Sequence, residues 1–312
     1  MAYGSEALTA AETAGFAADK PMMVVQQADT ASEANWTTTG DLAGSGDSQT
    51  DGKFPATRAY DDLGSILTKF RSEAPYAAAS PKYFNFEFSS AITFDTLLIL
   101  DHNFNSGGFT SVALEINENE DWSGTVLEIA KYTVSGTTDN RILITNLNHE
   151  GGSNTYSAGG TAKRYTDIPY ARLKIVHSGS RTPEVGEIIL GYRYQLPRNP
   201  DLPWNNKNEV SSVSDFVSSS GVTKRYVFNR GQGVRAFSAM YDTAADITLI
   251  DNWFNAIEEG TRPFVYIETP SSAPDARLML QQEAGLSFGL TGPSSRQLSM
   301  QMIEQQPFLS RE

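Results

Sequence analysis

The three histidines are the side chains best suited to acid–base or metal chemistry, yet they share no spacing. His102 follows Asp101 at the end of an apolar run, whereas His149 and His177 lie in separate settings. A carboxylate beside an imidazole at a strand end is either a metal pair or a hydrogen-bonded loop anchor, more often the second. The sequence contains no nucleophile elbow, zinc-binding helix or phosphate-binding loop. A Ser–His–Asp triad assembles in space, so spacing leaves that alternative open.

An acidic run, Glu115, Glu118, Glu120 and Asp121, offers the hard oxygen ligands that calcium takes. It lacks the ligand order of a calcium loop, so a solvated turn between two strands is the favoured interpretation. The Gly/Ser-rich segment 151–160 is predicted to be a loop rather than an anion cradle, because no strand precedes it and no helix follows it. We therefore expect neither a bound metal nor a cofactor.

Aromatic side chains in loop-like sequence are candidates for binding. Trp36, Trp122 and Trp204 are in such settings, where indole rings stack on sugars or anchor subunit interfaces. Interface or local packing is the favoured interpretation. Pro203 and Trp204 are expected near a contact between domains or copies.

The composition excludes several classes of protein. The 312 residues include 24 Lys and Arg against 37 Asp and Glu, a net charge of −13, and no Cys. This charge argues against binding to nucleic-acid phosphates, and the lack of Cys excludes disulfides, Cys-ligated metals and thiol nucleophiles. We expect no membrane insertion, because no apolar run reaches about 18 residues. The first residues also lack the pattern of a secretory signal.

Short β-strands separated by turns dominate the first two thirds of the chain. The apolar run 92–100 predicts a buried central strand, while 171–177 and 187–194 alternate apolar and polar residues. Such strands with no helical period between them predict a β-sandwich or jelly roll over 55–196, after an arm and loop-rich segment over 1–54. Within that segment, Met22–Gln27 is a strand candidate.

The remaining chain predicts a second, smaller domain. Prolines and asparagines mark 197–210 as a linker, since proline ends helices and central strands. Over 211–312, strand patterns surround one amphipathic helix that starts after Thr243, has Asp246 in its first turn and ends near Gly260. One helix on an antiparallel sheet is an α+β arrangement, so the fold class is mainly β with an α+β second domain.

Three stretches resemble discoidin-type, galactose-binding-like jelly-roll domains. They are Pro55–Asp62 with Lys69-Phe70-Arg71, Tyr83–Trp122, and Ala171–Val176 followed by Glu187–Tyr192. The resemblance implies sugar binding through the family's binding loop. Phe70 stands where that family often has Trp and the calcium ligand order is degraded, which favours a scaffold role. If this domain binds a glycan, Trp36, Asp62, Arg71 and Trp122 are the residues to probe.

The Asp101-His102-Asn103-Phe104 turn and the Leu190-Gly191-Tyr192 closing strand resemble domains of tailed-bacteriophage tail proteins. The strand–helix–strand order over 237–267 and the closing strand 299–305 are similar to the last domain of phage minor tail and distal-tail proteins. The resemblance implies a non-enzymatic component of the virion tail tip or baseplate. It would be made in the bacterial cytoplasm and form rings with its own copies and other tail proteins.

Two other functions remain open at the level of sequence. The first is a carbohydrate-binding adhesin that contacts a host cell-surface glycan. The second is a polysaccharide hydrolase, which requires two carboxylates about 5–9.5 Å apart in a groove. The many acidic residues would supply such pairs by chance, so this hydrolase hypothesis is the weakest.

Overall fold

The computed structural model of this chain describes most of two folded units. Unit 1 holds the described residues within 1–18 and 26–193, and unit 2 holds those within 19–25, 194–270 and 275–312. The described residues are 4–10, 12–13, 19–28, 31–37, 56–59, 69–72, 81–105, 108–134, 140–150, 153–177, 182–199, 201–208, 213–217, 223–227, 233–241, 243–270, 276–281, 287–290 and 296–304.

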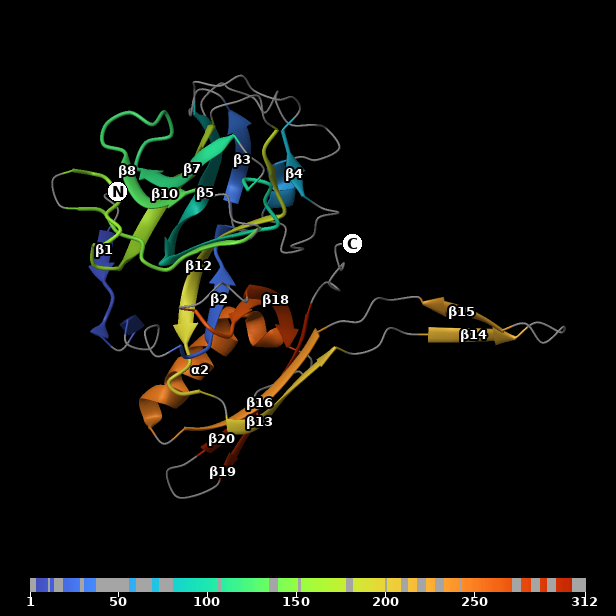
Figure 1. Cartoon of the computed structure of the whole chain (residues 1–312). Helices are drawn as coiled ribbons and strands as arrows, with labels where there is room; N and C mark the ends of the chain where they lie inside the picture. Colours follow the sequence, from blue (N-terminus) through green and yellow to red (C-terminus); the bar gives the residue numbers. More distant parts are fainter. Residues whose placement is uncertain are drawn as a thin grey trace. The chain divides into compact units, whose positions relative to one another are not determined.

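Unit 1 contains a large antiparallel sheet with the strand order β3-β5-β10-β7-β8, and β1 also pairs with β10 (Figure 1). The longest strands, β5 and β10, lie side by side near its centre, with Leu173 opposite Phe84. The strands are β1 (Gly4–Ala7), β3 (Ala31–Thr37), β5 (Lys82–Phe94), β7 (Phe109–Asn117), β8 (Leu127–Thr133) and β10 (Lys163–His177).

A second sheet of unit 1 has the order β12-β6-β9, in which β6 (Thr96–Leu100) lies between β12 (Glu187–Gln195) and β9 (Ile142–Ile144). β6 is buried along its whole length, which confirms the expected central strand. The sequence expected one strand over 92–100, but the structure breaks it at Asp95 into β5 and β6. A two-residue ladder joins β4 (Phe70–Arg71) to β11 (Glu184–Val185), and η2 (Ala56–Ala59) is a 3-10 turn.

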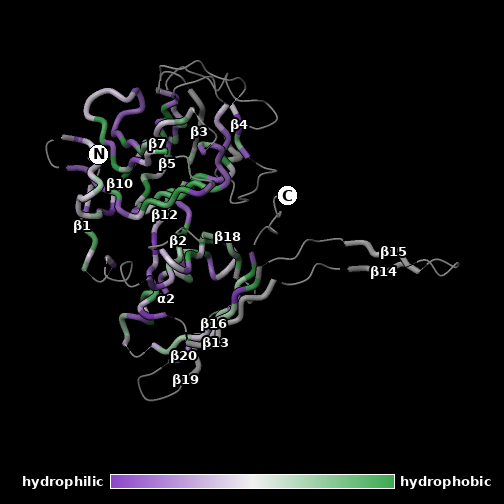
Figure 2. Tube along the Cα trace, in the orientation of Figure 1, coloured by the Kyte–Doolittle hydropathy of each residue, from purple (hydrophilic) through white to green (hydrophobic). Residues whose placement is uncertain are grey.

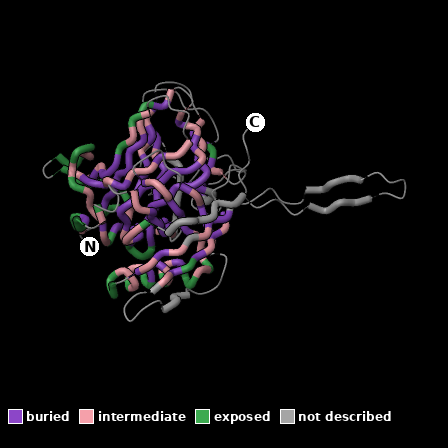
Figure 3. The backbone as a smooth tube through the Cα atoms, turned by 60° about the horizontal axis from the view of Figure 1, so that its bottom comes forward, coloured by how far each residue is buried: buried purple, intermediate pink, exposed green. Residues whose placement is uncertain are grey.

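The core of unit 1 is drawn from both sheets, so the expected β-sandwich is present. Leu114 of β7 and Leu173 of β10 belong to the same buried cluster as Ile99 of β6 and Ile188 of β12. Phe84 packs edge-to-face on Phe70 with 5.1 Å between the ring centroids. Figure 2 shows apolar (green) tube beside the label β12, and Figure 3 shows the buried residues in purple. Removing one such aromatic side chain typically costs about 3–5 kcal/mol.

Unit 2 is an antiparallel sheet with the order β13-β16-β20-β18-β17-β2, and β19 also pairs with β20. A separate two-stranded ladder joins β14 (Val213–Val217) to β15 (Thr223–Val227). The sheet strands are β2 (Met22–Gln26), β13 (Asp201–Asn208), β16 (Gly233–Tyr241), β17 (Phe264–Ile267), β18 (Ala276–Gln281), β19 (Ser287–Leu290) and β20 (Arg296–Glu304).

Helix α2 (Ala244–Ala256) packs on this sheet, as the sequence predicts. Thr243 is its N-cap and accepts a hydrogen bond from Asp246 N at 3.1 Å. Ile250, Trp253 and Ile257 are fully buried against sheet residues such as Phe264. The chain then turns through η3 (Glu258–Gly260), where Gly260 adopts a φ of 90°, the left-handed conformation expected of it.

Two segments differ from the sequence-based division into domains. Asp201–Asn208, expected within a linker over 197–210, form β13 and pair with β16. β13 stands at the end of the strand order, and an edge strand tolerates proline because one side of its backbone needs no ladder bond. Met22–Val24, expected in the N-terminal arm, pair with β17 of unit 2.

Candidate functional site

Arg71, a predicted glycan ligand, lies on β4 and is tied to Glu184 of β11. Arg71 Nε is 3.4 Å from Glu184 Oε1, and Lys69 Nζ binds the other carboxylate oxygen. The Arg71 side chain keeps 44% of its surface exposed. One carboxylate thus holds two cations at the rim of the sandwich, and Arg71 remains the more accessible of them.

The turn after β6 supports this rim through hydrogen bonds. Asn103 Oδ1 accepts from Glu184 N at 3.0 Å, and Asn103 Nδ2 donates to the Thr182 carbonyl at 2.8 Å. His102 is buried, and its Nδ1 accepts from Phe104 N at 3.2 Å. The Asp101 carboxylate accepts from Asn140 Nδ2 at 2.5 Å. Asp101 and His102 therefore anchor loops, which is the commoner of the two alternatives.

Trp122, the second predicted glycan ligand, covers Arg172 of β10. The guanidinium carbon of Arg172 lies 3.8 Å from the Trp122 ring centroid and 4.2 Å from that of Tyr83. Trp122 has a φ of 54° and keeps only 8% of its surface exposed. A cation held between two aromatic faces gains attraction from both rings. One face of Trp122 is thus occupied by the protein itself.

Glu115 of β7 completes this cluster from the same face of the sheet. It is opposite Arg172 in the ladder, and its two oxygens bind Arg172 at 2.7 Å and Lys174 at 2.9 Å. Burial alone would lower the pKa of Lys174, but the hydrogen bond and charge of Glu115 outweigh it and raise that pKa. Glu118, Glu120 and Asp121 follow as an exposed turn. The solvated turn that the sequence favoured therefore holds only these three, because Glu115 is a buried carboxylate within β7.

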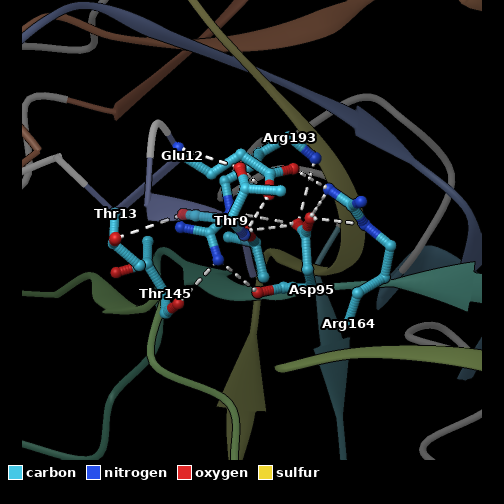
Figure 4. A network of polar contacts seen from close by, with 8 residues as sticks. Thr9, Glu12, Thr13, Asp95, Thr145, Arg164 and Arg193 are labelled. Atoms are coloured by element: carbon cyan, nitrogen blue, oxygen red, sulfur yellow. Dashed lines mark hydrogen bonds and ion pairs between the residues drawn. The ribbon is translucent and has the colours of Figure 1, made fainter. Parts of the chain in front are cut away.

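Asp95 is the centre of a second buried polar cluster (Figure 4). It is fully buried at the break between β5 and β6, and Oδ1 accepts from Thr96 Oγ1 at 3.0 Å and from Arg193 N at 3.1 Å. Oδ2 accepts from Arg164 Nη2 at 3.0 Å and from Arg164 Nε at 3.2 Å. Both oxygens are thus satisfied by four donors from three segments of the chain.

The two arginines of this cluster differ in how far their charge is compensated. Arg193 is 2% exposed, and burial lowers its pKa although Asp95 acts in the opposite direction. Burial also acts to lower the pKa of Arg164, but the carboxylates of Asp95 and Glu12 outweigh it and raise that pKa. Arg164 Nη2 donates to Glu12 Oε1 at 2.6 Å, and its guanidinium lies 4.4 Å from the Tyr192 ring centroid.

Glu12 fastens the N-terminal segment to the sandwich through this ion pair. Its other oxygen accepts from Thr9 N and Thr9 Oγ1, each at 2.7 Å, which together with Glu12 N donating to Thr9 Oγ1 forms a capping box. Burial would raise the pKa of Glu12, but the hydrogen bonds from Thr9 and Arg164 outweigh it and lower that pKa.

His149 is placed for structure as well. Its Nδ1 lies 2.9 Å from the Tyr165 hydroxyl, and burial together with the nearby Lys163 charge lowers its pKa. His177 packs edge-to-face on Phe109 at 6.2 Å. The three histidines occupy separate places, and the described residues contain no cluster of His, Asp and Glu able to hold a metal.

Of the four predicted glycan ligands, the structure describes the side chains of Arg71 and Trp122. Arg71 is opposite Glu184 of β11, a strand that follows β10 along the chain. Trp122 comes after β7, whose last residue, Asn117, is opposite Tyr170 near the middle of β10. Trp36 is at the ladder position opposite Phe84, while Pro203 and Trp204 lie within β13. The side chains of these three, and all of Asp62, are outside the described part.

Sequence reasoning missed the Asp95 cluster. The available signal was a lone carboxylate inside the apolar run 92–100, where a charge is costly unless it is paired. The partners could not be read from the sequence, because Arg164 and Arg193 meet Asp95 only through tertiary folding. Chemically, Asp95, Glu115 and Glu184 each bind two cations of unit 1.

No helix in the described ranges has the length and apolar character needed to cross a membrane. Comparison with known proteins finds no matching family model and no matching curated protein. Among solved structures, the chain is similar to a histidine mutant of the lectin-binding domain of Lectinolysin complexed with Lewis b. The identity is 12%, the match covers 54% of this chain and 98% of that one, and the TM-score is 0.34.

The chain is also similar to the family 32 carbohydrate-binding module of C. perfringens NanJ in complex with galactose. There the identity is 13%, the coverage is 55% of this chain and 98% of that one, and the TM-score is 0.34. A Ruminococcus gnavus GH29 fucosidase in complex with fucose matches over 53% of this chain and 26% of its own, with 12% identity and a TM-score of 0.35. The sugars named for these structures are ligands of those proteins.

Proposed function

We propose that this protein is a structural, non-catalytic component of a bacteriophage tail tip or baseplate, as a distal-tail or minor tail protein. It would assemble in a ring with its own copies and with other tail proteins. The observation that carries the proposal is the pairing of buried and half-buried carboxylates with cations of the same unit. Asp95, Glu115 and Glu184 each bind two cations of unit 1 at the distances given above. Side chains so engaged hold strands together rather than perform a reaction.

The second support is the set of elements behind the sequence resemblance to phage tail proteins. Those elements are β16, helix α2, β17 and the closing strand β20. The position in a virion and the tail-protein partners are inferred from this resemblance.

Localisation in purified particles tests this function. Antibodies against the protein, viewed by negative-stain electron microscopy, are expected to decorate one end of the tail, and cryo-electron microscopy is expected to find it there in several symmetric copies. A protein absent from purified virions would refute the proposal.

A second candidate function is glycan binding by unit 1. Arg71 favours it, because its guanidinium stays partly exposed beside Glu184 and such a pair can donate to and accept from sugar hydroxyls. A glycan array tests this with the wild type and with Arg71→Ala. Binding that the substitution abolishes supports the candidate, whereas no binding at millimolar sugar removes it.

A further inference from the structure

The described residues within 4–13, here called the β1 segment, contact one edge of β10. Strand β1 of this segment pairs with residues 163–166 of β10, while β5 pairs with the opposite edge. On the edge that β1 occupies, β7 covers β10 further along and ends where Asn117 is opposite Tyr170. The β1 segment therefore covers a stretch of β10 that no other described strand pairs with on that side.

The attachment of this segment is slight. Residues 5–7 are exposed, and Leu8, which is buried, lies outside the core cluster of unit 1. Beyond the ladder, the segment is held by Leu8 N, which donates to the Ala162 carbonyl at 3.0 Å, and by the ion pair of Glu12. A short, exposed strand with few buried contacts opens at a free energy well below that of global unfolding. The sandwich can therefore keep its core while the β1 segment leaves.

Arg164 is held in place independently of the β1 segment, because Asp95 also binds it (Figure 4). Arg164 Nη2 is 3.0 Å from Asp95 Oδ2 and 2.6 Å from Glu12 Oε1. Departure of Glu12 would leave this guanidinium with one carboxylate instead of two. It would also uncover the backbone of residues 163–166, and an open strand edge is a template for another strand. This stretch of β10, here called the slot, thus offers a ladder edge and a fixed cation.

The sequence of the β1 segment matches the slot at two positions. A Cβ on Gly4 would lie 2.4 Å from Thr166 Oγ1, so the close approach of the two strands favours glycine there. Eight positions later, Glu12 supplies the carboxylate that meets Arg164. A second copy of this chain carries both residues at the same spacing. The fit seen within one copy therefore indicates which segment would occupy the slot of another copy.

We propose that the β1 segment of one copy pairs with β10 of a second copy, with its Glu12 bound to Arg164 of that second copy. The inference rests on the proposed function, because it names one contact through which copies assemble. The contacts are the same within a copy and between copies, so the balance depends on the effective concentration of neighbouring slots. A segment passed from each copy to the next is a head-to-tail contact, which closes into a ring when the rotation permits.

Engineered cysteines test this exchange, since the sequence contains no Cys. Ala7 and Lys163 are opposite in the ladder, where Cα atoms about 4.5–5.5 Å apart permit a disulfide. Ala7→Cys and Lys163→Cys are made in separate chains, one with a mass tag, and are mixed under mild oxidation at the highest soluble concentration. The disulfide traps the exchanged state, so even a minor population accumulates. Non-reducing electrophoresis is expected to show a disulfide between the two chains at least about tenfold above the control mixture.

Two controls accompany this mixture. In the first, Lys131→Cys replaces Lys163→Cys, because Lys131 is exposed on β8 and outside the slot, so this mixture reports random collision. In the second, one chain carries both Ala7→Cys and Lys163→Cys at high dilution. There the disulfide is expected to form within the chain, which shows that the pair has the geometry to close. Unchanged melting temperatures show that each variant folds.

The exchange is refuted if the mixture yields no more disulfide between chains than the Lys131→Cys control. A double variant that does not close at high dilution contradicts the pairing of β1 with β10 on which the exchange depends. Virions separate this inference from the proposed function. In particles that carry the double variant, covalent multimers support the exchange and monomers alone defeat it. Absence of the wild type from purified virions defeats the proposed function, whereas the mixture still decides the exchange.

Discussion

Replacing Asp95 with asparagine tests whether the buried ion cluster stabilises unit 1. The substitution keeps the shape and removes the charge that faces Arg164 and the 2%-exposed Arg193. One amide oxygen can still accept from Arg193 N, but the amide NH₂ then faces the two Arg164 donors that now bind Oδ2 at 3.0 and 3.2 Å. The amide NH₂ and the Arg164 N–H groups are all donors, so in this buried site neither side has an acceptor.

The magnitude follows from the cost of leaving a buried charge without its partner, about 3–5 kcal/mol. At about 2–4 °C per kcal/mol, the melting temperature of unit 1 should fall by about 6–20 °C. Differential scanning calorimetry measures this fall. Hydrogen–deuterium exchange of peptides from β5, β6 and β10 assigns it to unit 1.

Asp167→Asn is the matched control, because Asp167 is exposed and has a φ of 57°, which asparagine tolerates. Its effect should stay within about 0.5 kcal/mol. In a double-mutant cycle with Arg164→Met, the coupling to Asp95→Asn should exceed about 1 kcal/mol. A loss below about 1 kcal/mol for Asp95→Asn would show that the cluster does not stabilise the fold as argued.

Three further predictions concern single side chains. Arg172→Met should destabilise unit 1 by about 3 kcal/mol in urea unfolding, because it leaves the buried Glu115 with Lys174 alone, and Trp122 fluorescence should change. Glu12 has a lowered folded-state pKa, so its contribution is complete above the unfolded value of about 4.3 and is lost as pH falls through the folded pKa. In thermal melts, the wild type should therefore have a higher melting temperature than Glu12→Gln at neutral pH, and the two melting temperatures should converge as the pH falls. Thr243→Ala should cost unit 2 about 1 kcal/mol in thermal melts by removing the cap of α2.

Each of these predictions has its own control or contradicting result. Lys131→Met removes an exposed cation and should change stability little, so an equal loss would contradict the argument for Arg172. A Glu12→Gln difference in stability that persists in acid would contradict the assigned titration of Glu12. Thr248→Ala, inside α2, should be neutral or slightly stabilising, and an equal cost at both threonines would contradict capping.

Much of the fold could be predicted from local sequence patterns. Helix α2 could be located from Thr243, Asp246 and Gly260, because capping depends on neighbours three or four residues apart. β12, β20 and the second half of β10, Ala171–His177, could be located from alternation, which a half-buried strand imposes on its own sequence. The inward position of Trp253 was missed, although it continues the spacing from Ile250 to Ile257.

Long-range partners could not be predicted. Pro203 suggested a linker, because proline excludes a central strand, and the sequence does not reveal that β13 is an edge strand. The pairing of Arg172 with Glu115 depends on the register between β10 and β7, which is set only when the sheet forms. Of the site candidates, Arg71 and Trp122 were chosen by residue type, but their ion pair and ring contact arise from segments distant in the chain.

Strand β2 pairs with a strand, β17, that is synthesised much later. Val24 pairs with Val265, so β2 waits about 240 residues for β17 to leave the ribosome. Gln26, at the other end of β2, bonds to Ile188 and Leu190 of β12, which is synthesised earlier. Until then Met22–Gln26, which is wholly buried in the finished molecule, lacks its β17 neighbour on the nascent chain. A fragment that begins after the sandwich would carry β17 without this strand. Expression trials should therefore keep residues 19–28 with the C-terminal half, and chaperone dependence should be greatest before β17 is synthesised.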